Sequence, residues 1–147
     1  MIISIFPQKD STIYSTAVSE AVNTGIDEIL ELAKVVSESG TTGISNSRIL
    51  MKFDLTGISQ SLNLGEISRS VQPDTTPEFY LNLYCTEAKN IPIDYNLEFS
   101  PISESWDMGI GRSSNVPYTK DGVSWKYRDS EEVGTEWNDP SSSNALE

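Results

Sequence analysis

The sequence predicts an all-β protein, an antiparallel β-sandwich of jelly-roll type. Three observations lead to this class: several short segments alternate apolar and polar residues, convincing helices are few, and long polar loops separate the alternating segments. Immunoglobulin topology is disfavoured, because a chain with one cysteine lacks the Cys…Trp…Cys pattern. With 147 residues, the chain is long enough for one core and too short for two ordinary domains.

The N-terminal third contains three candidate elements. Residues 2–6, IISIF, are β-branched and aromatic and end at Pro7, which favours a short edge strand. A second strand is expected at 11–14, STIY. Residues 26–36, IDEILELAKVV, fit two structures: their apolar residues recur at helical spacing, but part of the stretch also alternates. On the residues alone a helix is slightly favoured there.

The stretch 48–55, RILMKFDL, has the clearest strand pattern in the chain. One face of the extended stretch is wholly apolar, and the other carries one apolar residue among charges; the two sets are Ile49, Met51, Phe53 and Leu55, and Arg48, Leu50, Lys52 and Asp54. Such alternation is typical of a half-buried strand. We expect a structural role for this stretch, with Arg48 and Asp54 on its polar face available for cross-strand ion pairing.

The middle of the chain predicts a connection followed by a strand pair. Residues 56–78 are polar, with a short helical turn around Leu62 to Ile67. Residues 79–88, FYLNLYCTEA, and 95–103, YNLEFSPIS, alternate again. The link between them is too short for a parallel crossover, so we expect them to be antiparallel neighbours.

The last third predicts a loop at 107–122, a short strand at 122–127 and a tail. From Asp129 onward the chain has six carboxylates and no basic residue, a composition typical of a solvated segment. We therefore expect two parts, a β-sandwich domain at 1–128 and an acidic, flexible C-terminal tail at 129–147.

The composition excludes several classes of function. The 22 acidic and 10 basic residues give a net charge of −12, which repels nucleic acid and acidic membranes. The absence of histidine removes histidine-based nucleophile systems, most zinc sites and the usual general base. The single Cys85 can form no internal disulfide, and its place in an expected strand predicts a buried, inert thiol. We expect no enzymatic activity and no cofactor.

The N-terminus and the hydropathy pattern indicate where the chain is found. The first ten residues lack the basic start, the apolar stretch and the cleavage site of a signal peptide. No window approaches the roughly 18 apolar residues that a membrane span needs. We expect a protein that is soluble in the compartment where it is made.

Aromatic residues supply the candidate binding site. Such side chains can stack on sugar rings or anchor a protein interface, and five of them gather in the last third: Trp106, Tyr118, Trp125, Tyr127 and Trp137. Packing inside the sandwich is the alternative for Trp106 and Trp125, and the sequence favours it.

Carboxylates offer two further possibilities, and both are disfavoured. Glu104 and Asp107 flank Trp106, and a carboxylate pair can perform glycosidase chemistry across a cleft; a solvated loop is the favoured interpretation. Calcium needs oxygen ligands, but no EF-hand spacing is present. Capping and turn roles are therefore favoured for Asp10, Asp54, Asp107 and Asp121, and no metal is expected.

Several motifs in order give a family resemblance over about residues 3–128. They are IFPQKDSTIYS, NTGIDEILEL, SRILMKFDL, FYLNLYCTEA, ESWDMGIG and GVSWKYRD. Together they resemble the disaggregatase-related (DNRLRE-type) repeat, a family grouped with carbohydrate-binding modules. More closely, the sequences of these motifs are similar to those of virion structural proteins of marine tailed phages that contain such a domain.

The resemblance implies a fold and two candidate functions. It implies a β-sandwich, and for residues 28–36 it therefore favours a strand over the helix that the residues alone suggest. It also implies a non-enzymatic virion structural protein at the neck, collar or capsid exterior, made in the host cytoplasm, whose partners are other virion proteins, including copies of itself. The alternative is a carbohydrate-binding module that adheres to glycans. The family's further strands after the tryptophan-containing motif are missing, so we expect a fragment, a short variant or a strand supplied by a partner.

Overall fold

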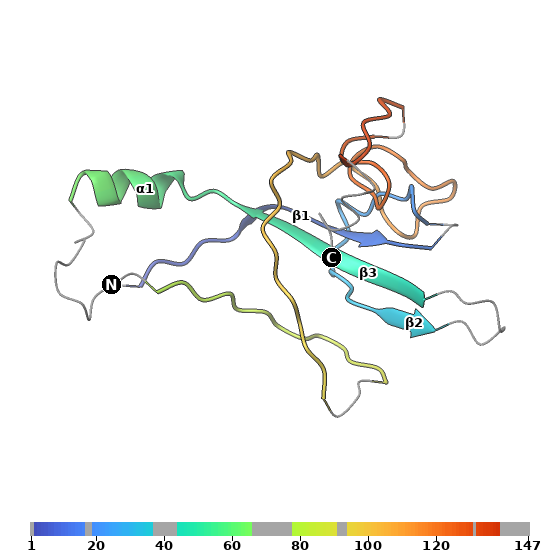
Figure 1. Cartoon of the computed structure of the whole chain (residues 1–147), viewed down its shortest axis with the longest axis horizontal. Helices are drawn as coiled ribbons and strands as arrows, with labels where there is room; N and C mark the ends of the chain where they lie inside the picture. Colours follow the sequence, from blue (N-terminus) through green and yellow to red (C-terminus); the bar gives the residue numbers. More distant parts are fainter. Residues whose placement is uncertain are drawn as a thin grey trace. The chain divides into compact units, whose positions relative to one another are not determined.

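The computed structural model describes residues 2–16, 19–36, 44–65, 78–90, 94–130 and 132–138. Its elements in chain order are β1 (Pro7–Tyr14), β2 (Lys34–Val36), β3 (Ile44–Phe53) and α1 (Thr56–Asn63). The strands form one antiparallel sheet in the order β1-β3-β2 (Figure 1). Most of the remaining described residues are coil, so the chain is a small all-β fold, and these residues form no second sheet.

The described contacts divide the chain into two compact units. The first unit combines Met1–Asp54 with Pro101–Glu147, and the second is Leu55–Ser100. Described residues of the expected tail pair back onto the preceding chain in the first unit: the amide of Arg128 donates to the carbonyl of Thr135 at 3.0 Å, and Tyr127 forms an antiparallel bridge with Glu136.

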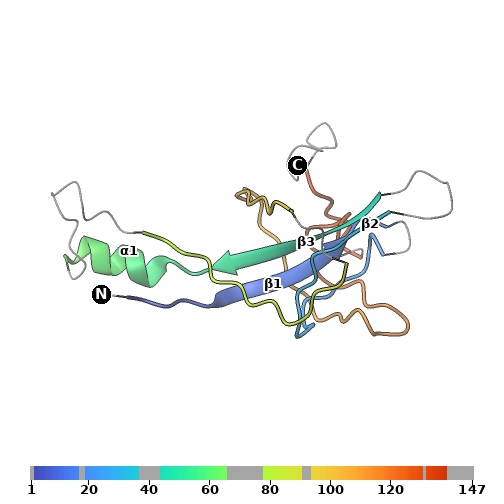
Figure 2. The same cartoon turned by 90° about the horizontal axis from the view of Figure 1, so that it is seen from below.

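The core of the first unit lies against one face of β1 and β3, which run side by side (Figures 1 and 2). The register pairs Ser11 with Leu50 and Ile13 with Arg48, so these four side chains share a face. Ile13 and Leu50 are 0% and 3% exposed, and they form a cluster with Trp106 and Val123. The strand predicted at 48–55 is therefore confirmed, although it begins earlier and ends at Phe53.

The interior of the first unit contains many polar side chains. The buried apolar residues of the described chain are Ile13, Val22, Leu50, Trp106 and Val123. The buried polar ones are Ser11, Thr12, Asn23, Thr24, Ser47, Ser124 and Ser130. A buried polar group destabilises the fold unless it is hydrogen-bonded. The stability of this unit therefore depends on specific hydrogen bonds as much as on apolar packing.

The side chain of Thr24 forms hydrogen bonds with the backbone of β1 at the edge of this strand that faces away from β3. Its hydroxyl donates to the carbonyl of Thr12 at 2.7 Å and accepts from the amide of Thr12 at 3.0 Å. The same oxygen lies 3.3 Å from the hydroxyl of Ser11. One hydroxyl thus satisfies the backbone groups that an adjacent strand would otherwise pair.

We expect Thr24→Val to lower the free energy of unfolding by about 2 kcal/mol, because an isosteric apolar group leaves two buried backbone groups of Thr12 unpaired. Urea unfolding followed by tryptophan fluorescence measures the change. Ser100→Ala, which removes a hydroxyl at an exposed position of the second unit, is the control and should have little effect. Equal losses in the two variants would contradict this role of Thr24.

Two predicted strands are wrong. Residues 79–88 and 95–103 are coil, with nearly all of their side chains exposed. Cys85, expected to be buried in the first of them, is exposed as well. An alternating pattern forms a strand only when another strand supplies hydrogen-bond partners, and neither segment pairs with a described strand.

Other predicted boundaries also change. Residues 2–6 precede β1 as exposed coil, whereas 11–14 falls inside β1. Of residues 26–36, only the last three form a strand, which is β2. At 122–127 the structure has the single bridge of Tyr127 in place of a strand.

The helix of the second unit forms without buried side chains. The amide of Ser59 donates to the carbonyl of Leu55 at 3.0 Å, and that of Leu64 to the carbonyl of Gln60 at 2.9 Å. No side chain caps the N-terminus of α1. The helical turn expected around Leu62 to Ile67 overlaps this helix only at Leu62 and Asn63, and Ile67 lies outside the described residues.

Candidate functional site

The three tryptophans of the candidate site gather around the core of the first unit. Trp106 is 9% exposed and belongs to the buried cluster. Trp125 and Trp137 are partly buried and pack against that cluster. The guanidinium of Arg48 stacks over the Trp125 ring, 4.6 Å from its centroid, and the indole nitrogen of Trp137 donates to the carbonyl of Ser124 at 3.0 Å. These side chains therefore pack and hydrogen-bond within the unit.

The two candidate tyrosines have different surroundings. Tyr127 is half-buried, with the ammonium of Lys126 5.3 Å from the centroid of its ring. Tyr118 is 48% exposed and lies in the loop predicted at 107–122. Of the five candidate aromatics, Tyr118 presents the most accessible ring to a ligand.

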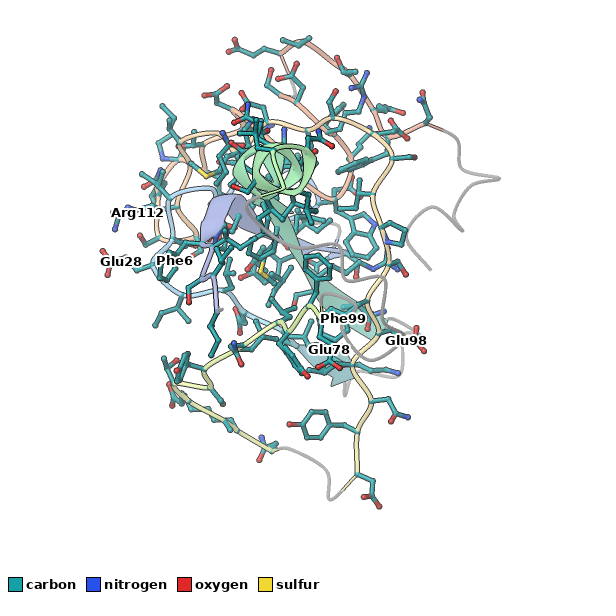
Figure 3. The ribbon with its side chains drawn as sticks, turned by 90° about the vertical axis from the view of Figure 1, so that its left-hand side faces the viewer. Phe6, Glu28, Glu78, Glu98, Phe99 and Arg112 are labelled. Atoms are coloured by element: carbon teal, nitrogen blue, oxygen red, sulfur yellow. The ribbon has the colours of Figure 1, made fainter. Side chains whose placement is uncertain are left out.

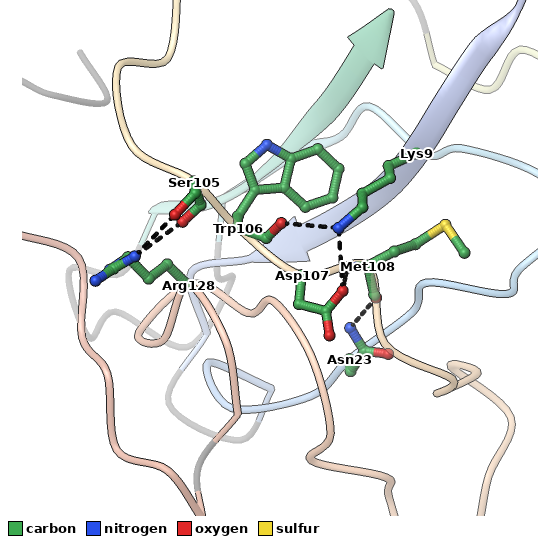
Figure 4. A network of polar contacts seen from close by, with 7 residues as sticks. All are labelled: Lys9, Asn23, Ser105, Trp106, Asp107, Met108 and Arg128. Atoms are coloured by element: carbon green, nitrogen blue, oxygen red, sulfur yellow. Dashed lines mark hydrogen bonds and ion pairs between the residues drawn. The ribbon is translucent and has the colours of Figure 1, made fainter. Parts of the chain in front are cut away.

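The carboxylates on either side of Trp106 are held in separate ion pairs. Figure 4 shows the pair of Asp107 with Lys9. Asp107 lies 3.2 Å from the ammonium of Lys9, which also donates to the carbonyl of Trp106 at 3.3 Å. Glu104 lies 3.4 Å from the Nε of Arg128 and accepts from the amide of Asn138 at 3.2 Å. Each carboxylate thus joins chain segments that are distant in sequence.

A buried side chain that sequence analysis missed connects the two parts of the first unit. The amide nitrogen of Asn23 donates to the carbonyls of Met108 and Val123, at 2.8 Å each. Its oxygen accepts from the amides of Gly111 at 2.7 Å and Gly25 at 3.2 Å. Asn23 is 0% exposed, and these four bonds satisfy its whole amide group.

The residues around Asn23 are glycines, because backbone segments approach one another there too closely to leave room for a Cβ atom. A Cβ atom on Gly109 would lie 2.1 Å from the carbonyl oxygen of Asp121 and 2.6 Å from Oδ1 of Asn23. A Cβ atom on Gly122 would lie 2.4 Å from the Cα of Gly109. Both glycines also have positive φ, +72° and +98°. We call Asn23 with Gly25, Gly109, Gly111 and Gly122 the asparagine hub.

Tyr14 links β1 to the segment before β2. Its hydroxyl donates to the carboxylate of Glu31 at 2.9 Å. Burial raises the pKa of Tyr14 well above its ordinary value of 10.0, and the hydrogen bond to Glu31 and the charges of Glu31 and Asp27 raise it further. The neutral phenol is therefore the form that the folded chain prefers.

A raised folded-state pKa contributes stability that is complete below the unfolded pKa, near 10.0, and is lost as the pH rises through the folded pKa. We expect Tyr14→Phe to reduce the loss of stability above pH 10, because phenylalanine has no proton to release. Chemical unfolding at a series of alkaline pH values measures the effect. Tyr95→Phe, at an exposed position, should keep the parental profile, and the same flattening in both variants would contradict the assignment.

The second unit exposes many large apolar side chains. Along residues 79–99 their exposed fractions run from 44% at Leu97 to 93% at Tyr84. Phe99, labelled in Figure 3 beside Glu98, is 65% exposed. The members of this set are Phe79, Tyr80, Leu81, Leu83, Tyr84, Tyr95, Leu97 and Phe99.

The first unit also exposes large apolar side chains, among them Ile2 and Phe6, and it carries charged pairs on its surface. Glu28 and Arg112 lie beside each other in Figure 3, with 3.7 Å between the carboxylate and guanidinium atoms. No group of three or more Asp, Glu, Cys or His residues in the described part of the chain could hold a metal ion. The four aspartates considered for calcium therefore form no such group where they are described.

Comparisons with known proteins complete the description. No protein-family model, curated protein or solved structure matches the chain. Within the described ranges, no helix has the length and apolar character needed to cross a membrane.

Proposed function

We propose that the chain is a non-enzymatic structural protein of a tailed-bacteriophage virion, located at the neck, collar or capsid exterior and acting through contacts with other virion proteins. The observation that supports this most is the run of exposed apolar side chains along residues 79–99. Exposing many large apolar side chains to water is unfavourable, so such residues often mark a surface that binds another protein. Assembly contacts would cover it.

Features of the first unit agree with this role. The tryptophans that could have bound a ligand pack around the core, and the carboxylates beside Trp106 are held in ion pairs. The net charge of −12 would keep the protein away from packaged DNA. The resemblance of the motifs to phage virion proteins supplies the particular kind of assembly.

The test is quantitative mass spectrometry of virions purified from the phage that encodes the sequence. We expect peptides of this chain in density-banded particles at a constant ratio to the major capsid protein, and retention of the chain after a high-salt wash. The chain in infected-cell lysate but not in the banded particles would overturn the proposal.

A carbohydrate-binding role is the second candidate, and one observation favours it: the 48% exposed ring of Tyr118. An oligosaccharide array probed with the full chain separates the two functions. The assembly role predicts no binding above background. Binding that Tyr118→Ala abolishes, with tryptophan fluorescence unchanged, would favour the glycan-binding role. Trp106→Ala is unsuitable here, because it would damage the core.

A further inference from the structure

Residues 79–86 have the composition of a strand, and no described strand pairs with them. Their sequence, FYLNLYCT, is rich in aromatic residues and leucine and contains no proline, glycine or charge. No described residue forms a hydrogen bond with their backbone amides or carbonyls. Phe79 and Tyr84 are 71% and 93% exposed. We call residues 79–86 the apolar segment; it offers both the hydrogen-bonding groups and the side chains that strand addition requires.

Charge distinguishes the partners that could pair with this segment. The whole chain carries −12, so most surfaces of two copies repel each other. The apolar segment is free of that repulsion, because its nearest carboxylates, Glu78 and Glu87, lie just beyond its two ends. A basic partner would find no acidic group within it. Its chemistry therefore fits an uncharged strand of the same kind.

We propose that the apolar segment binds the apolar segment of a second copy of this chain, as an antiparallel strand pair about a two-fold axis at Asn82. The inference rests on the proposed assembly role and names the partner in it. This register places each side chain opposite a compatible one: Phe79 opposite Cys85, Tyr80 opposite Tyr84, Leu81 opposite Leu83, and Asn82 opposite Asn82.

The antiparallel register also avoids placing the flanking carboxylates directly opposite each other. Glu78 of one copy lies opposite Thr86 of the other, whereas a parallel in-register pair would place Glu78 opposite Glu78. A two-fold pair uses the same patch on both copies and closes on itself. The expected product is a dimer and not an open filament.

The first test measures the mass of the full chain by sedimentation equilibrium across a concentration series. We expect a reversible dimer. Leu83→Lys should raise the dimer dissociation constant roughly 100-fold, because each pair then buries two ammonium groups. Leu97→Lys makes the same substitution at a similarly exposed leucine outside the segment and should leave the constant within a few-fold. Tryptophan fluorescence confirms that the first unit remains folded in both variants.

The second test checks the register by oxidation. Phe79→Cys places a new thiol opposite the natural Cys85 of the other copy, so the variant should form a covalent dimer on nonreducing electrophoresis much faster than the parent chain. Equally rapid cross-linking of the parent would indicate a parallel pair, with Cys85 beside Cys85, and would overturn the register.

Three results of the first test would overturn the inference itself: a monomer at all concentrations, an open-ended polymer, or equal weakening by Leu83→Lys and Leu97→Lys. None of these decides the proposed function, which depends on the presence of the chain in virions. A chain found in virions but monomeric in solution would retain the assembly role and lose the self-pairing.

Discussion

Replacing Asn23 by aspartate is expected to lower the free energy of unfolding by about 4 kcal/mol. The side chain keeps its size, but an oxygen takes the place of the nitrogen that donates to the carbonyls of Met108 and Val123. Three oxygen acceptors then face one another in a site with no exposed surface. The substitution therefore adds a buried negative charge and leaves two buried carbonyls without donors.

The pH dependence of Asn23→Asp provides a second measurement. Burial and the facing carbonyls raise the folded-state pKa of the introduced carboxyl. A raised pKa gives stability that is present at low pH and is lost as the pH rises through it, so the deficit relative to the parent should shrink from about pH 8 to about pH 4. Urea unfolding at both pH values measures it.

Asn96→Asp is the matched control for Asn23→Asp, because it makes the same charge change at an exposed position. It should alter the free energy of unfolding by less than about 0.5 kcal/mol. If the two variants lose the same stability, the asparagine hub does not hold the first unit together, and the effect is one of net charge.

Replacing Gly109 by alanine is expected to lower the free energy of unfolding by about 3 kcal/mol or more. The added methyl group would lie 2.1 Å from the carbonyl oxygen of Asp121, and backbone atoms cannot move aside as a flexible side chain can. It would also press on Oδ1 of Asn23 at 2.6 Å. Thermal unfolding followed by tryptophan fluorescence and far-ultraviolet circular dichroism measures the loss.

Gly65→Ala separates this steric effect from backbone strain. Gly65 has nearly the same φ as Gly109, +73° against +72°, but a Cβ atom there would meet nothing within 4 Å. Its substitution should lose only the strain of the left-handed conformation, about 1 kcal/mol. Similar losses at Gly65 and Gly109 would mean that φ alone decides the outcome.

The strands that sequence analysis located correctly share one property. In RILMKFDL the alternation coincides with a real partner, because β1 lies beside β3 in register. FYLNLYCTEA alternates just as clearly and remains unpaired. Alternation reports which residues would suit a sheet, but pairing depends on another part of the chain or on another molecule. A single sequence does not specify that partner.

The candidate site was only partly predictable for a related reason. The tryptophans lie in or against one core cluster, but the sequence alone could not show that they pack there. Asn23 appeared in the sequence only as the first residue of the motif NTGIDEILEL. The sequence feature that could have pointed to this site is the closely spaced pair Gly109 and Gly111, which allows two backbone segments to approach each other. Its meaning depends on contacts between distant residues, which local patterns do not encode.

The asparagine hub has a consequence for how the protein is made. Asn23 is bonded to residues 85, 88 and 100 positions further along the chain. At typical translation rates, a ribosome needs roughly 5–20 s to add 100 residues. During that interval the nascent N-terminal segment lacks the partners of its buried amide, and contacts so distant in sequence also slow folding after release. The full set of hydrogen bonds to Asn23 can therefore form only after Val123 has left the ribosome.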